Sequence, residues 1–200
     1  LIKILVQNSL SFKLIDYPDI RKIHGKGIPV VGGIAIFLTF ILYVFILFGS
    51  SIFSEYIYFF LSILFIFLLG LFDDMRGLSA HKKILLQFSA SLLLVYGLSF
   101  NQFILFNSFG YYFNIFILVC FIFGICNSIN LIDGIDGLAG CISIIILLEL
   151  ITFNIFFLGN LVFVNNILVA LLGSLLAFIL YNRYPAKIFL GDSGSLFLGW

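Results

Sequence analysis

Charged residues are scarce in this 200-residue chain, where Lys, Arg, Asp and Glu together make up 10%. A typical soluble domain carries about 25% of them. Hydrophobic residues make up 63%. These values exclude a soluble globular class, and the chain is too long for a single membrane span. The formal net charge of +1 gives no sign of a nucleic-acid partner, and none is expected.

Cysteine and histidine are also few, with three and two residues. Cys120, Cys126 and Cys141 lie in or beside apolar runs and show neither metal-site spacing nor a disulfide framework, so we interpret them as small core residues. No signal peptide with a cleavage site is visible. The chain begins without Met and stops at Trp200 inside an apolar run, from which we expect a piece of a longer protein.

Long apolar runs dominate what is present. A helix needs about 20 apolar residues to cross a bilayer, and lipid offers no partners to free backbone groups. The runs therefore predict an all-α, polytopic membrane bundle: one integral-membrane domain over 1–200, with six complete transmembrane helices and partial helices at both ends. The predicted spans are 30–49, 53–72, 83–98, 111–126, 138–158 and 161–181.

Charges gather in alternate connections between these runs. The intervening connections hold no charged residue except Glu55. Seven of the nine acidic residues lie in the charged connections, which the positive-inside rule places in the cytoplasm. Structural needs alone would not collect the acids there, so we predict that these connections converge on one site. The charged connections are 13–29, 73–83, 127–137 and 182–195.

The stretch from Asn127 to Gly140 carries a polar residue at every third position, followed by glycines at the same period. In a helix or 3₁₀ turn this spacing lines four oxygen-bearing side chains along one strip, beside uncovered backbone. Such a surface suits a hard cation or a phosphate. The alternative is a polar loop with glycine helix caps, although carboxylates at a membrane edge are costly without partners. The strip is Asn127, Asn130, Asp133 and Asp136, with Gly134, Gly137 and Gly140.

Two further groups lie where the second predicted span ends and the third begins. Asp73 and Asp74 are adjacent carboxylates that repel unless a cation relieves them. They indicate a base, a magnesium–phosphate site, or a solvated helix end with Arg76 as partner. Lys83 shares a helix face with Gln87 and is either a phosphate ligand or a snorkelling membrane anchor.

The segment GDSGS at 191–195 opens the last apolar run. A glycine-rich turn before a helix presents N–H groups to an anion and leaves Asp192 free to hold a cation. Alternatively, Asp192 or a serine caps the helix that starts near Leu196. The two histidines, His24 and His81, lie among lysines, and His24 has the denser basic surroundings.

Together these stretches resemble the polyprenyl-phosphate N-acetylhexosamine-1-phosphate transferases, glycosyltransferase family four. The resemblance covers nearly the whole chain in the family's order, and it is most specific at 127–139 and 187–195. It looks closer to the enzymes that load N-acetylglucosamine 1-phosphate for surface polysaccharide or teichoic acid; the muramoyl-pentapeptide branch is the alternative. The carrying residues outside these stretches are Asp16, Pro18, Arg21, Lys22, His24, Pro29, Gly32, Gly33, Asp73, Asp74, Lys83 and Gln87.

The resemblance implies a multi-pass enzyme of the cell membrane with its site loops in the cytoplasm. The phosphate of polyprenyl (undecaprenyl) phosphate attacks the β-phosphorus of a UDP-N-acetylhexosamine, and UMP leaves. Such chemistry needs charge neutralisation and in-line placement, for which Mg²⁺ is expected, or Mn²⁺ in its place. A covalent aspartyl intermediate is the alternative route, and a homodimer is compatible with the resemblance. The family has a further histidine-containing loop nearer its C-terminus, which this sequence does not reach.

The resemblance also implies roles. Asp73, assisted by Asp74, orients or deprotonates the lipid phosphate, and Asp192 completes the catalytic set. Asp192 and Asn130 hold the metal, with Asp133 nearby. We further expect the backbone of Gly134 and Gly137 to lie against the nucleotide sugar or a neighbouring helix, without room for a Cβ. The implied substrate-binding residues are Lys83, Asn127, Asp133, Gly134, Asp136, Gly137 and His24.

Two rival classes fit less well. A CDP-alcohol phosphotransferase also carries Asp-Gly repeats, but its motif needs an Arg where this chain has Leu138-Ala139-Gly140. A transporter would place its acids near the bilayer midplane. Only Glu149 is predicted mid-span, where it has no evident partner.

Overall fold

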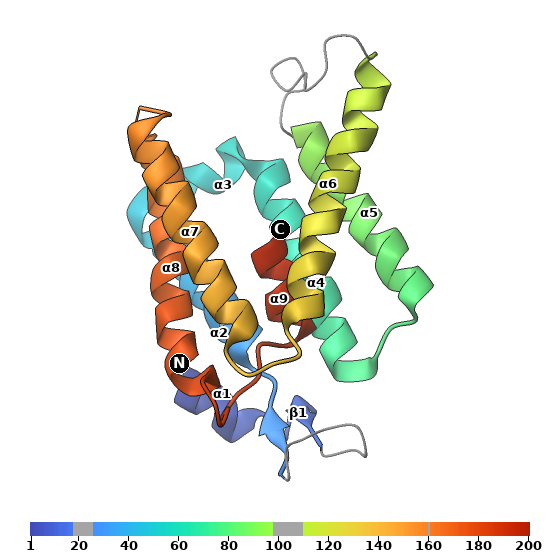
Figure 1. The fold of residues 1–200 in the computed structure, drawn as a ribbon, viewed down its shortest axis with the longest axis vertical. Helices are drawn as coiled ribbons and strands as arrows, with labels where there is room; N and C mark the ends of the chain where they lie inside the picture. Colours follow the sequence, from blue (N-terminus) through green and yellow to red (C-terminus); the bar gives the residue numbers. More distant parts are fainter. Residues whose placement is uncertain (18–25, 98–109, 160) are drawn as a thin grey trace.

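The computed structural model describes residues 1–17, 26–97, 110–159 and 161–200, which form a helical bundle with one small β-hairpin. His24 lies outside the described residues. Figure 1 shows the bundle with its long helices running roughly along one axis. The elements are α1 (Ile2–Asn8), β1 (Ile15–Asp16), β2 (Ile28–Pro29), α2 (Gly32–Phe48), α3 (Ser51–Glu55), α4 (Ile57–Arg76), α5 (Ala80–Gly97), α6 (Tyr111–Ile132), α7 (Leu138–Phe156), α8 (Val162–Asn182) and α9 (Gly191–Gly199).

The membrane helical bundle is confirmed, but six complete spans are not supported. Within the described ranges, four helices are long and apolar enough to cross a bilayer: α4, α6, α7 and α8. Helix α2 has only 17 residues, because it ends at Gly49, whose φ of +70° leaves the helical region. Helix α5 has 18 residues, but its first turn holds His81, Lys82 and Lys83, which lowers its apolar content.

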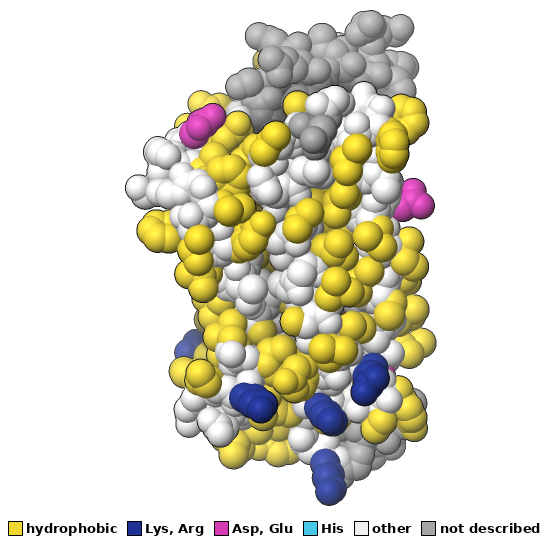
Figure 2. Space-filling view, turned by 90° about the vertical axis from the view of Figure 1, so that its left-hand side faces the viewer, with side chains coloured by type: hydrophobic (Ala, Val, Ile, Leu, Met, Phe, Trp, Pro, Cys, Tyr) yellow, Lys and Arg dark blue, Asp and Glu magenta, His cyan; other side chains and the backbone are white. Residues whose placement is uncertain are grey.

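The connections that the sequence predicts to converge lie at one end of the bundle. Figure 1 shows the α4–α5, α6–α7 and α8–α9 connections at the lower end, near the β-hairpin. Basic side chains gather at the same end in Figure 2, and hydrophobic side chains cover the middle of that face. A band of apolar surface with cationic residues collected at one end is the pattern of a helical membrane protein.

Helix α9 lies inside the bundle, between α4, α6 and α2. Glycines on its neighbours allow the close approach. A Cβ at Gly70 of α4 would lie 2.4 Å from the Asp192 carbonyl oxygen, and one at Gly33 of α2 would lie 2.2 Å from the Gly194 nitrogen. Side chains of α9 then complete the core, where Leu196 is fully buried. The position of Asp192 is therefore set by backbone packing against two other helices.

Backbone hydrogen bonds fix the segment before α9 to the segment before α2. The Phe189 N–H donates to the Pro29 carbonyl over 2.9 Å, and the Gly32 and Gly33 N–H groups donate to the carbonyls of Phe189 and Leu190. Val30 and Phe189 form a parallel bridge. Segments more than 150 residues apart in the chain are thus joined at the basic end.

Candidate active site at the basic end of the bundle

Asp192 is the side chain on which several helices converge. Lys83 of α5 donates its ammonium to Asp192 Oδ2 over 2.7 Å, and the same ammonium lies 2.9 Å from Asp73 Oδ2. Asn130 of α6 donates its amide to Asp192 Oδ1 and, over 2.8 Å, to the Ser195 hydroxyl. The predicted convergence is confirmed for the described residues, because Asp73 and Asp192 share one lysine.

Asp74 has a different environment from Asp73, although the two are adjacent in sequence. Its two oxygens accept the backbone N–H groups of Asp192 and Ser193, over 2.7 and 3.0 Å. Asp74 therefore caps the N-terminus of α9 from another helix. The prediction that Asp192 or a serine caps this helix is wrong: α9 begins at Gly191 and makes no side-chain cap of its own.

Arg76 does not act as the predicted partner of the two acids. Its guanidinium lies 5.0 Å from the centroid of the Phe72 ring, and no ion pair joins it to Asp73 or Asp74. Asp73 instead accepts the backbone N–H of Leu78 and contacts Lys83. The alternative of a solvated helix end paired with Arg76 is thereby excluded.

Asp133 adds a further carboxylate to this group. It directly follows α6 and is partly buried. Burial is the largest cause of the raised pKa of the Asp133 carboxyl, and together with the charges of Asp192 and Asp74 it brings this pKa to about 8. Burial also raises the pKa of Asp192, against the opposing effect of Lys83. The carboxylates outnumber the single ammonium that contacts them in the described part of the chain, so the site favours added positive charge.

Asp136 and Gly137 stand apart from this cluster and hold two connections together. Asp136 Oδ2 accepts the Ala186 N–H over 2.9 Å, and the Gly137 N–H donates to the Asn182 side chain over 3.0 Å. Asn182 in turn donates to the Ile188 carbonyl. Asn182 was not among the residues predicted from the sequence, although an amide at the end of a long apolar span was an available signal. These bonds fix the α6–α7 turn against the loop that leads to Asp192.

The two glycines predicted to lack room for a Cβ behave differently. A Cβ at Gly134 would meet no atom within 4 Å, so packing against a neighbouring helix is wrong for this residue. Gly137 has room at ordinary contact distance, but its φ of +77° is a conformation that other residues rarely adopt. Contact of either glycine with a nucleotide sugar stays a prediction.

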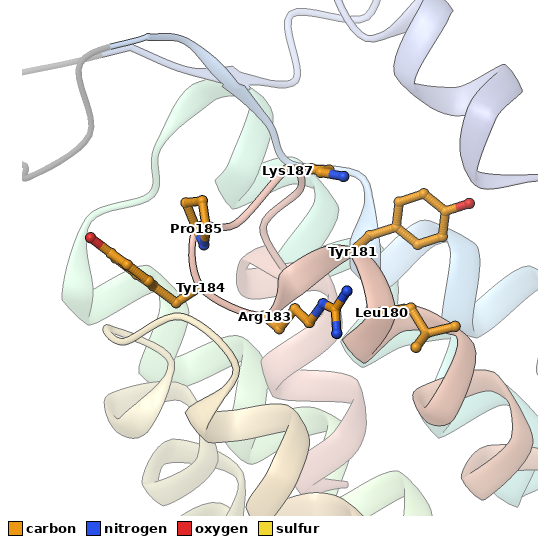
Figure 3. A pocket seen from close by; sticks show the side chains of 6 residues that line it. All are labelled: Leu180, Tyr181, Arg183, Tyr184, Pro185 and Lys187. Carbon is orange, nitrogen blue, oxygen red and sulfur yellow. The ribbon is translucent and has the colours of Figure 1, made fainter.

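A pocket of about 300 Å³ lies on the loop between α8 and α9. Figure 3 shows that its lining comes from the end of α8 and from the following loop, with Arg183 and Lys187 as its basic side chains. None of the predicted site residues lines it. The pocket therefore adds positive charge to the loop before Asp192 but is distinct from the acidic cluster. Its lining is Leu180, Tyr181, Arg183, Tyr184, Pro185 and Lys187.

The fold and the cluster define a polytopic membrane protein with a carboxylate-rich, lysine-bearing site at one end of its helices. A family model described as glycosyl transferase family 4 matches residues 56–200. The chain belongs to this family.

Curated relatives support the same assignment. The chain is 36% identical over 199 residues to the "Probable undecaprenyl-phosphate N-acetylglucosaminyl 1-phosphate transferase" of Bacillus subtilis (strain 168), covering 96% of this chain and 54% of the relative. It is 33% identical to the undecaprenyl-phosphate alpha-N-acetylglucosaminyl 1-phosphate transferase of Thermotoga maritima, covering 94% and 54%. It is 34% identical to the phospho-N-acetylmuramoyl-pentapeptide-transferase of Wolbachia pipientis wMel, covering 91% and 60%. The chain thus spans little more than half the length of these relatives.

Proposed function

We propose that the protein containing this chain transfers an N-acetylhexosamine 1-phosphate, of the N-acetylglucosamine type, from a UDP-sugar to undecaprenyl phosphate. An oxygen of the lipid phosphate forms a bond to the β-phosphorus of the UDP-sugar. The bond from that phosphorus to the bridging oxygen breaks, and UMP leaves with that oxygen. The product is a lipid-linked diphospho-sugar, which begins the synthesis of a cell-envelope polysaccharide.

The observation that carries this proposal is the joining of Asp73, Lys83, Asn130 and Asp192 by direct contacts. These residues come from stretches that are far apart in the chain and that all carry the family resemblance. Lys83 supplies a positive charge beside the acids, where a phosphate group would need it. Asp73 lies against that lysine, which supports its proposed role of orienting or deprotonating the lipid phosphate.

A divalent cation fits the donor set of this site. Hard cations such as Mg²⁺ bind carboxylate and amide oxygens, and the site offers several carboxylates around one ammonium. Asp192 and Asn130 would hold the ion, with Asp133 beside them. When bound, it would neutralise charge on the diphosphate as bonds to phosphorus form and break. In the described residues Lys83 and Asn130 occupy the two Asp192 oxygens, and no ready-made group of three acidic, histidine or cysteine ligands surrounds a common point.

The basic end of the bundle is proposed to face the cytoplasm, in line with the positive-inside rule. The transporter alternative is less well supported. Glu149 is exposed on α7, whereas the interacting acids lie at the end of the bundle rather than at its middle.

The test is UMP release by the full-length protein in detergent, with undecaprenyl phosphate and a panel of UDP-sugars that includes UDP-N-acetylglucosamine and UDP-muramoyl-pentapeptide. Magnesium-dependent release with UDP-N-acetylglucosamine is expected. Release with the pentapeptide substrate alone would select the other branch. No release with any UDP-sugar would reject the proposed function.

Asp192→Asn in the same protein should abolish magnesium-dependent turnover, because a neutral amide binds a hard dication far more weakly than a carboxylate does. Glu55→Gln, at the opposite end of the bundle, is the matched control and should keep parent activity. Full turnover by Asp192→Asn would remove this residue from the metal site.

A further inference from the structure

A hydrogen-bonded amide pair joins α5 to α6 next to the acidic cluster. Asn127 of α6 donates its amide N–H to Gln87 Oε1 of α5 over 2.8 Å. The same Asn127 nitrogen donates to the carbonyl of Phe123, also over 2.8 Å. The Gln87 side chain is completely buried, and Asn127 is partly buried. The pair is thus an enclosed polar contact between two helices.

The orientation of both amides follows from the Phe123 carbonyl. A carbonyl can only accept, so Asn127 must turn its NH₂ group toward it. That NH₂ group also faces Gln87, so Gln87 must present its oxygen. The Gln87 Nε2 group is then buried, and in the described part of the chain it has no acceptor. Turning Gln87 over would place two NH₂ groups against each other.

The pair lies one helical turn from the groups that hold Asp192. Gln87 follows Lys83 by four residues on α5, and Asn127 precedes Asn130 by three on α6, so each amide shares a helix face with a contact of Asp192. Lys83 and Asn130 bind different oxygens of that carboxylate. Any sliding of α5 along α6 would move these two groups apart.

We propose that Gln87 and Asn127 are positioning residues that fix the register between α5 and α6, and so hold Lys83 and Asn130 at their spacing around Asp192. Apolar side chains pack without directional bonds and tolerate small shifts, whereas a hydrogen bond does not. The proposal rests on the proposed function.

Stability alone does not explain this pair. A buried donor without a partner costs free energy, and replacing both members of a buried polar pair by apolar side chains can be neutral or stabilising. The pair should therefore contribute little to folding and much to turnover. This separates a positioning role from a purely structural one.

The experiment uses the full-length protein with Gln87→Leu, Asn127→Leu and the double variant, scored for UMP release and for thermal unfolding in detergent. Each single variant should lower kcat on the order of 10–100-fold, the size expected for misplaced reacting groups. The kcat of the double variant should be no lower than that of the less active single variant, because the two residues act through one contact. It should also unfold at or above the parent temperature. The KM for the UDP-sugar should stay close to the parent value.

The control is Asn154→Leu, which removes a buried amide that hydrogen-bonds both backbone groups of Leu161 far from the acidic cluster. It should lower the unfolding temperature and keep the kcat of the folded fraction. Parent-like turnover in Gln87→Leu would overturn the proposal. The proposal would also be overturned if the losses of kcat in the two single variants added up in the double variant. The same holds if the loss of turnover only followed the fraction of unfolded protein. An inactive parent would instead reject the proposed function.

Discussion

Asp74 acts on the candidate site through backbone atoms. Both oxygens of its carboxylate accept N–H groups from the first turn of α9, which begins the residue before Asp192. Two anchored N–H groups leave the first turn of α9 little freedom to rotate. The direction of the Asp192 side chain is therefore set in part by Asp74 of α4, which is far away in the sequence.

Asp74→Asn should destabilise the protein by roughly 1–3 kcal/mol, because an amide turns a donor toward one of the two N–H groups and leaves that group unpaired. Turnover should fall with it, since Asp192 loses its anchor. Thermal unfolding in detergent and UMP release measure the two effects. Glu55→Gln serves as the control. An Asp74→Asn protein with the parent unfolding temperature would contradict the capping role.

Asp133 predicts a pH dependence of stability. Burial, with a smaller effect of the nearby acids, raises the pKa of its carboxyl to about 8, whereas an unfolded chain has a value near 4. Between these values the folded state binds more protons than the unfolded state, so the free energy of unfolding should fall as pH rises. Asp133→Asn stays neutral and should lose this decline. Unfolding temperatures from pH 5 to 8.5 in EDTA test it; parallel curves for parent and variant would refute it.

At the scale of elements, the packing of α9 against α4 and α2 depends on glycine. Gly70 and Gly33 let the backbone of α9 come into direct contact with α4 and α2. A methyl group at Gly70 would collide with the backbone of Asp192 and Ser193, which cannot move aside as a flexible side chain could. The apolar packing of α9 and the position of Asp192 are thus coupled.

Gly70→Ala should destabilise the protein by about 1–3 kcal/mol through overpacking, and it should also lower turnover. Gly173→Ala is the matched control on α8, where a Cβ would meet no atom within 4 Å. That variant should gain about 0.5–1 kcal/mol, because alanine is the better helix former. The measurement is again thermal unfolding in detergent. Equal unfolding temperatures for the two variants would contradict the close packing of α9 against Gly70.

The apolar runs predicted most of the elements. The stretch from Asn127 was expected to be a loop, but α6 continues to Ile132, so two of its polar residues lie on a helix. The predicted number of spans was wrong because the length of an apolar run does not show that α2 ends before Gly49. Nor does it show that the first turn of α5 is charged. Sequence periodicity also gives no sign that the short α9 lies inside the bundle.

The candidate site was predicted in outline and missed in detail. The sequence grouped Asp73, Lys83, Asn130 and Asp192, which the structure joins. It gave Asp74 only an assisting role beside Asp73 and did not predict that Asp74 caps α9, because the partners of Asp74 lie 118 and 119 residues along the chain. Such pairings are decided by tertiary packing. Local patterns cannot reveal them.

The whole molecule is polarised along its long axis. The acidic cluster and the basic side chains lie at one end (Figure 2), and α3, which holds Glu55, lies toward the other (Figure 1). The proposed orientation places the first end in the cytoplasm. Because the chain spans little more than half of its relatives, orientation is best tested in the full-length protein.

In a background with all cysteines replaced by serine, Ser79→Cys and Ser54→Cys should react from opposite sides of the membrane. Both positions are exposed, one beside the charged α4–α5 connection and the other in α3. A membrane-impermeant maleimide applied to intact cells should label Ser54→Cys only, and permeabilised cells should show both. Labelling of both variants in intact cells, or of Ser79→Cys alone, would overturn the proposed orientation.

The backbone contacts between residues 29–33 and 189–190 have a consequence for biosynthesis. Helix α9 packs against α2, α4 and α6, and it is synthesised after all three. The contacts that hold α9 therefore cannot form until α9 itself has been synthesised. Contacts of such long sequence separation form slowly. The candidate site is completed only when α9 packs between those helices, so a substitution that blocks this packing should leave an inserted protein with an incomplete site.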